Sequence, residues 1–264
     1  MHLGKSIRME RIINRDTGRT IIVPVDHGVT VGPIYGLVDL KGAVNDITEG
    51  GANAVLMHKG LVRCGHRESG QDIGLVIHLS ASTKHSPSPN AKTLVGSVED
   101  GIKLGADAVS VHVNIGDEKE GQMFQDLGEV TSLANEWGMP VVAMVYGRSP
   151  NISDGYHPEI VSHCARVGEE LGADIVKVNY TGDMESFHKV VEACCIPVVI
   201  AGGPKLDNDK DLIQMVHDSG QAGGAGLSIG RNVFQADNRR KLVQALNKVV
   251  HEDASVQDAL NMLE

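Results

Sequence analysis

Short runs of β-branched and aliphatic residues recur along the whole chain, and segments with helical periodicity separate them. The runs are apolar throughout rather than alternating, which is typical of parallel strands covered on both faces. The connections are long enough for crossover helices, as in 124–138 and 158–172. We interpret the runs as eight strands, at 20–25, 53–57, 73–79, 107–113, 140–145, 174–179, 197–201 and 226–230.

Four segments share a further pattern, in which a glycine ends a helix, an alanine permits close packing, and a strand follows. They are 49–58, 103–112, 170–179 and 222–231. Eight strands alternating with helices over 264 residues favour a (β/α)8 TIM barrel, an α/β fold. A doubly wound open sheet is the alternative, and it is disfavoured because no G-x-G-x-x-G motif follows the first strand.

No linker, low-complexity tract or charge block divides the chain, so we expect one domain over residues 1–264 with a short extra helix within 254–263. A net charge of −10 and only one Trp, four Tyr and three Phe disfavour a nucleic-acid partner. No window resembles a signal peptide or a membrane span, and the four cysteines form no C-x-x-C pair. We therefore expect a cytoplasmic protein with no membrane partner.

Polar residues follow the predicted strands at their carboxyl ends, where TIM barrels carry their chemistry. In the strand at 174–179, the period of two places Lys177 with Ile175 and Asn179, opposite two valines. A valine face suits helix packing, so Lys177 is expected to point into the barrel, where burial lowers the pKa of its amine. A neutral amine is what Schiff-base formation requires. A lysine that reaches solvent or pairs with a carboxylate is the alternative.

Tyr146 and Asp26 follow two other predicted strands. By the same parity, Tyr146 shares a face with Val142 and Met144, so its phenol can donate a proton beside the lysine. Asp26 closes the first strand and can act as a general acid or base. The alternatives are a packed tyrosine with a satisfied hydroxyl and an aspartate with a helix N-cap or turn role.

Glycine clusters follow the last two predicted strands, as AGGP (201–204) and SIGRN (228–232). Barrel enzymes often bind phosphate with these two loops, through backbone N–H groups and a short helix. Glycine permits close backbone approach, and Arg231 can add a charge-assisted contact. The pattern predicts a phosphate site, with tight turns and a surface arginine as the alternative.

A metal site is the chemical alternative to the lysine. His58, His78 and His112 occur at strand ends, and His27 is next to Asp26. The sequence contains no H-x-H or H-E-x-x-H motif, and strand parity turns His27 away from the face of Asp26. We therefore expect no catalytic metal.

Six segments carry a distinctive combination of motifs: VPVDHGVTVGPIYGLVD (23–39), GGANAVLMHKG (50–60), VSVHVNIG (109–116), VKVNYTGD (176–183), AGGPK (201–205) and SIGRNVFQ (228–235). Together they resemble a known family, the 2-amino-3,7-dideoxy-D-threo-hept-6-ulosonate synthases, which are relatives of the archaeal-type class I fructose-bisphosphate aldolases. The similarity spans nearly the whole chain.

The resemblance implies roles for individual residues. Lys177 would form the Schiff base, Tyr146 would be the proton donor and Asp26 the proton acceptor. Because the iminium is itself an electron sink, no metal or other cofactor is needed. The residues implied to contact the phosphorylated sugar are Asp26, His27, Gly28, Val29, Thr30, Tyr146, Gly147, Arg148, Lys177, Gly202, Gly203, Gly230 and Arg231.

The implied reaction is a transaldol transfer from 6-deoxy-5-ketofructose 1-phosphate to L-aspartate 4-semialdehyde, which yields an intermediate for 3-dehydroquinate and aromatic amino acids. One alternative is a class I fructose-bisphosphate aldolase, or a related lyase or thiolase, acting on another phosphorylated ketose. A second is a non-catalytic sugar-phosphate-binding protein. The resemblance also implies a homo-oligomer, with decamers of pentameric rings known among relatives.

Overall fold

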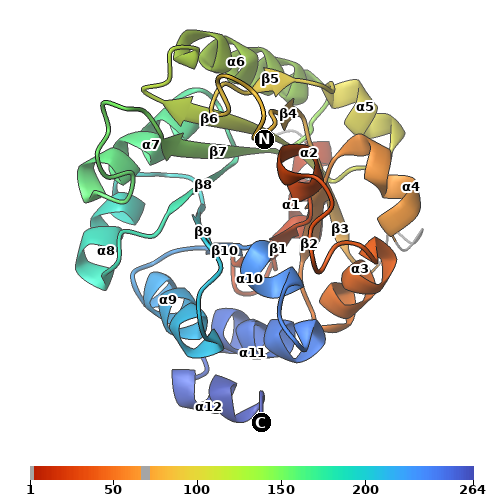
Figure 1. The fold of residues 1–264 in the computed structure, drawn as a ribbon, viewed down its shortest axis with the longest axis vertical. Helices are drawn as coiled ribbons and strands as arrows, with labels where there is room; N and C mark the ends of the chain where they lie inside the picture. Colours follow the sequence, from red (N-terminus) through yellow and green to blue (C-terminus); the bar gives the residue numbers. More distant parts are fainter. Residues whose placement is uncertain (1–2, 67–71) are drawn as a thin grey trace.

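The computed structural model describes residues 3–66 and 72–264, and within them eight parallel strands close into a barrel (Figure 1). The TIM-barrel prediction is confirmed, and every predicted strand lies within two residues of an observed one. The barrel strands are β1 (Thr20–Pro24), β2 (Ala54–Met57), β3 (Gly74–His78), β6 (Ala108–Ile115), β7 (Val141–Gly147), β8 (Ile175–Asn179), β9 (Val198–Ala201) and β10 (Gly226–Ser228).

The strand order around the barrel is β1-β10-β9-β8-β7-β6-β3-β2, and every neighbouring pair is parallel. All carboxyl ends therefore meet at one mouth. Closure between the first and last strands pairs Thr20 with Gly226. Gly226 has a φ of +108°, and a Cβ there would lie 2.0 Å from the Thr20 carbonyl oxygen, so only glycine permits this approach.

Helices surround the barrel, as Figure 1 shows. Among the described residues, no helix is both long and apolar enough to cross a membrane. The last helix lies within the segment where a short extra helix was expected. The helices are α1 (Leu3–Ile12), α2 (His27–Val31), α3 (Leu40–Glu49), the 3-10 helix η1 (Lys59–Leu61), α4 (Val62–Gly65), α5 (Val98–Lys103), α6 (Glu120–Glu136), α7 (Pro158–Glu170), α8 (Met184–Glu192), α9 (Asp209–Gln221), α10 (Arg231–Phe234), α11 (Arg239–Glu252) and α12 (Val256–Asn261).

Two apolar clusters lie on opposite faces of the strands. One fills the barrel and includes Ile175 of β8 with Val142 and Tyr146 of β7. The other lies between the strands and the helices and includes Val176 and Val178 of β8. The alternation predicted for these strands is therefore confirmed, and it sets which side chains reach the inside of the barrel.

Helix α1 covers the amino-terminal end of the barrel. Its Ile12 belongs to the interior cluster, and two ion pairs hold it to residues just before strands. Lys5 Nζ lies 3.1 Å from Asp174 Oδ2, and Arg11 Nε lies 2.6 Å from Asp107 Oδ1. With this end covered, the interior opens toward the carboxyl ends of the strands.

A small hairpin follows β3, before α5 and β6, and was not predicted. It consists of β4 (Ser80–Ala81) and β5 (Thr93–Leu94), paired antiparallel. The loop between them is fixed to the barrel where Asn114 Nδ2 donates to the Asn90 carbonyl oxygen at 2.6 Å. The hairpin thereby places Lys92 at the barrel mouth.

Candidate active site

A pocket of about 470 Å³ opens at the carboxyl ends of the strands, a size that suits a small substrate. The structure brings most of the predicted site residues into its lining, but not Gly28 or Val29. Those that line it are Asp26, His27, Thr30, Tyr146, Gly147, Arg148, Lys177, Gly202, Gly203, Gly230 and Arg231.

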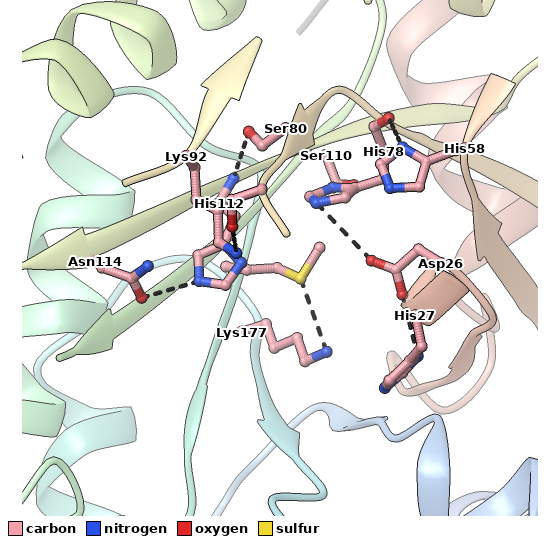
Figure 2. Close-up of polar contacts among 12 residues, drawn as sticks. Asp26, His27, His58, His78, Ser80, Lys92, Ser110, His112, Asn114 and Lys177 are labelled. Carbon is pink, nitrogen blue, oxygen red and sulfur yellow. Dashed lines mark hydrogen bonds and ion pairs between the residues drawn. The ribbon is translucent and has the colours of Figure 1, made fainter. Parts of the chain in front are cut away.

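Lys177 lies in the middle of β8, and its side chain reaches the pocket as parity predicted (Figure 2). The residue is only 7% exposed, and its Nζ atom is 3.8 Å from Met144 Sδ. Burial lowers the pKa of the Lys177 amine to about 8, with the charge of Asp26 opposing this shift and that of Arg148 adding to it. The amine can therefore act as a nucleophile near neutral pH.

Adduct formation at Lys177 is expected to depend on pH in a way that reports this shift. Only the neutral amine attacks a carbonyl, so the rate of trapping a ketone with cyanoborohydride is expected to rise about tenfold per pH unit below pH 8 and to level off above it. With an ordinary lysine, the rate of trapping would keep rising with pH up to the usual pKa of 10.5. A profile that still climbs at pH 10 contradicts the lowered pKa.

Asp26 lies between β1 and α2, and its carboxylate is surrounded by histidines (Figure 2). Its Oδ2 atom is 3.8 Å from His78 Nε2, while Nδ1 of the same ring lies 2.8 Å from Ser110 Oγ. Burial acts to raise the pKa of Asp26, but His78, His27 and Lys177 outweigh it and hold the pKa below its usual value. Asp26 occupies the N-cap position of α2, but its carboxylate makes no capping hydrogen bond to that helix.

The prediction for His27 is corrected by the structure. Strand β1 ends at Pro24 and α2 begins at His27, so strand alternation does not extend to this point. His27 lines the same pocket as Asp26, with its Nδ1 atom 3.5 Å from Asp26 Oδ1. Burial lowers the pKa of the His27 ring, which favours its neutral form.

Tyr146 is buried near the end of β7, where its ring contacts the His112 ring and the Arg148 guanidinium. The His112 ring meets it edge-on at 5.1 Å, and the Arg148 guanidinium lies 4.6 Å from its centroid. Burial raises the pKa of the Tyr146 phenol well above its usual value, with the Arg148 charge opposing the shift. The phenol therefore stays protonated until a strong base forms beside it.

The glycine loops after β9 and β10 are tightly packed against the barrel. A Cβ at Gly230 would lie 2.4 Å from the Pro24 carbonyl oxygen, and Gly203 has a φ of +60°. The protein's own packing therefore requires these glycines. Beside them, the Arg231 Nε and Ser228 Oγ atoms are buried with no hydrogen-bond partner among the described residues. Buried donors without partners fit an anionic ligand.

The pocket also contains residues that were not predicted as part of the site. Asn179 and Ser228 share the inward parity of Lys177 and Gly230, a signal available in the sequence. His58, His78 and His112, considered as metal ligands, line the pocket as well. In the part of the chain that the structure describes, no three His, Cys, Asp or Glu side chains form a cluster suited to a metal ion.

A TIM barrel with a buried lysine at its mouth is an arrangement typical of class I aldolases, and the chain belongs to the DeoC/LacD aldolase family, whose sequence profile matches residues 20–236. Over 257 residues it is 41% identical to a 2-amino-3,7-dideoxy-D-threo-hept-6-ulosonate synthase of Halobacterium salinarum, with 97% of this chain and 95% of that one covered. The family resemblance found in the sequence is thereby confirmed.

Two further similarities agree with this membership. The chain is 38% identical to a 2-amino-4,5-dihydroxy-6-oxo-7-(phosphonooxy)heptanoate synthase of Streptomyces griseus, over 96% of this chain and 92% of that one. A Schiff-base-forming fructose-1,6-bisphosphate aldolase superposes with a TM-score of 0.86 at 29% identity, covering 94% of this chain and all of that one. The chain is a Schiff-base aldolase or transaldolase-type enzyme.

Proposed function

We propose that this chain transfers a three-carbon enamine from 6-deoxy-5-ketofructose 1-phosphate to L-aspartate 4-semialdehyde, giving 2-amino-3,7-dideoxy-D-threo-hept-6-ulosonate. The observation that carries the proposal is the buried Lys177 amine, whose lowered pKa and place in the pocket suit attack on a ketone. The 41% identity to the Halobacterium synthase supports the choice of substrates.

The neutral Lys177 amine adds to the ketone carbon C5 of the donor, and loss of water leaves an iminium. Asp26 takes the proton of the C3 hydroxyl while the C3–C4 bond breaks, so that C3 leaves in hydroxypyruvaldehyde phosphate and the bonding electrons form the enamine. The enamine carbon then attacks the aldehyde of the acceptor, and Tyr146 protonates the new alkoxide. The proton on Asp26 returns to Tyr146, and water releases the product from Lys177.

Phosphate recognition is proposed for Gly202, Gly203, Gly230 and Arg231. The buried Arg231 Nε atom without a partner supports an anion here, and backbone N–H groups of the loops can add hydrogen bonds. The remaining sugar contacts are proposed for the rest of the predicted set that lines the pocket: Asp26, His27, Thr30, Tyr146, Gly147, Arg148 and Lys177.

A second candidate function uses a different donor, which carries a phosphate on the carbon next to the ketone. The Streptomyces product carries a phosphonooxy group at C7, whereas the ulosonate is deoxygenated there. The three-carbon donor unit of the Streptomyces product therefore corresponds to dihydroxyacetone phosphate. The unpartnered Arg231 and Ser228 atoms also suit a phosphate in that position.

The purified protein is expected to convert aspartate semialdehyde and the ketofructose phosphate to the 7-deoxy product, identified by mass spectrometry. Parallel reactions supply dihydroxyacetone phosphate with the same acceptor, and fructose 1,6-bisphosphate alone. A 7-phosphonooxy product would establish the second candidate. Cleavage of fructose bisphosphate alone would establish an aldolase and overturn the synthase proposal.

We also propose a single domain, a cytoplasmic location and a homo-oligomeric assembly. The four cysteines are free, which fits a reducing compartment. Tyr35 and Val38 are 73% and 83% exposed, and such apolar surface suits a contact between copies. Light scattering on the purified protein measures the assembly, and a monomer at all concentrations would reject it.

A further inference from the structure

Lys92 is a cation at the pocket to which the proposed mechanism gives no role. It lies on the loop side of the β4–β5 hairpin, half-buried, with its Nζ atom 2.5 Å from Ser82 Oγ. Burial, together with the nearby Arg148 charge, lowers the pKa of its amine to about 8, and the charge of Asp26 opposes this shift. Figure 2 shows Lys92 and Lys177 in the same view of the site.

Lys92 and Arg148 are two cations at the pocket that lack a salt-bridge partner among the described residues, although the more distant Asp26 carboxylate acts on Lys92. Across residues 3–66 and 72–264, no salt bridge joins either side chain to a carboxylate. Arg148 lies over the Tyr146 ring, so it is positioned beside the proposed proton donor. Two like charges near one another at a pocket repel, and an anionic ligand between them relieves that repulsion.

The strand order places this pair away from the glycine loops. Around the barrel, β9 and β10, which precede the glycine loops, lie opposite β3 and β6, and the Lys92 hairpin lies between these two strands in the chain. Figure 1 shows α10 and the β4–β5 hairpin on opposite sides of the barrel mouth. Lys177 on β8 and Arg148 after β7 lie on the arc between them. The pocket therefore has two cationic poles, Arg231 beside the glycine loops on one side and the pair of Lys92 and Arg148 on the other. The nucleophile Lys177 lies between them.

We propose that Lys92 and Arg148 bind the carboxylate of the acceptor aldehyde, which makes Lys92 a residue that determines acceptor specificity. This inference rests on the proposed function in its second form, in which the donor phosphate stays beside the ketone, at the glycine loops, and the acceptor binds on the other side of the new bond. Both synthase relatives make seven-carbon 2-amino acids with a ketone at C6, so the acid end of their acceptor is the same. In the Streptomyces product the phosphate and the carboxylate are at opposite ends of the seven-carbon chain. This arrangement matches cationic groups on opposite sides of the pocket.

The test isolates the acceptor carboxylate. Hydroxyacetone, an uncharged ketone that forms the same enamine on Lys177, serves as donor, so the acceptor carries the only substrate carboxylate. Succinic semialdehyde and butanal are matched acceptors that differ in whether the chain ends in a carboxylate or a methyl group. Aspartate semialdehyde is measured beside them, and cyanoborohydride trapping of hydroxyacetone without acceptor reports the lysine chemistry alone.

Lys92→Met is expected to raise KM for both semialdehydes about tenfold or more, because a charge-assisted contact is lost. It is expected to leave kcat/KM for butanal and the trapping of hydroxyacetone within about twofold, since neither involves an anion. Lys92→Arg is expected to recover most of the affinity. Lys84→Met, which removes an exposed lysine from the same hairpin, is the control and is expected to change none of these values.

An equal loss of kcat/KM with butanal would show that Lys92 only shapes the hairpin, which would overturn the proposal. Unchanged KM values for the semialdehydes would overturn it as well. Weaker semialdehyde binding in Arg231→Met but not in Lys92→Met would place the carboxylate at the other pole. Absence of trapping in the unmodified protein would instead refute the Schiff-base proposal. Calorimetric binding of succinic semialdehyde to Lys177→Met, with and without Lys92→Met, then tests the carboxylate site without turnover.

Discussion

Lys177→Met is expected to lower turnover by about four orders of magnitude or more and to eliminate the borohydride-stable adduct, because no other group in the proposed mechanism can hold the enamine. Methionine is close to lysine in volume and fits beside the Met144 sulfur, which contacts the amine at 3.8 Å. The measurements are steady-state turnover and the mass of the peptide containing residue 177 after reduction.

The same variant is expected to fold at least as stably as the unmodified protein at pH 7. The folded-state pKa of Lys177 is lowered from 10.5 to about 8, so the unfolded chain binds more protons between these values. Stability then rises with pH through that window, and at pH 7 the buried amine costs about 3 kcal/mol that methionine does not. Thermal unfolding across pH 7 to 10 checks this, and it separates lost chemistry from lost structure.

Lys189→Met provides the matched control. Lys189 is an exposed lysine on α8 that pairs with Glu185 at 3.0 Å across one helical turn, a contact of small energetic value. Its replacement is expected to leave turnover and trapping unchanged. Persistence of the adduct in Lys177→Met, on a different lysine, would move the nucleophile elsewhere and reject the mechanism.

The parts of the site that lie in regular strands were predictable from the sequence, because a two-residue period decides which way each side chain points. Lys177 and Tyr146 point into the barrel for this reason, as do Met144 and Ile175. The eight strands were also predictable, since parallel strands buried on both faces appear in the sequence as continuous apolar runs.

The parts that depend on turns and long connections were not predictable in this way. His27 reaches the pocket because a helix begins immediately after Asp26, and no periodicity in the sequence marks that change. Lys92 is distant from any barrel strand in the sequence, and it reaches the mouth on a hairpin whose loop Asn114 of β6 helps to fix. His78 lies at a strand end, but its contact with Asp26 depends on the order and register in which β1, β2 and β3 pair.

Asp26→Asn is expected to lower turnover about 10²- to 10⁴-fold while leaving the adduct at Lys177 intact. The amide cannot accept the proton released when the carbon–carbon bond breaks, whereas attack of the amine on the ketone does not require it. The Asp26 charge holds the pKa of Lys177 up against burial, so its removal lowers that pKa further and makes trapping at pH 7 faster rather than slower.

Separate assays of trapping and turnover distinguish a proton acceptor from a structural residue at this position. Asp39→Asn is the matched control, because Asp39 caps α3 through the Gly42 N–H at 2.9 Å and asparagine caps a helix equally well. It is expected to change neither assay. If Asp26→Asn instead loses trapping and turnover in parallel, the carboxylate acts by holding His78 and His27 in place, and the proton acceptor must be sought among those rings.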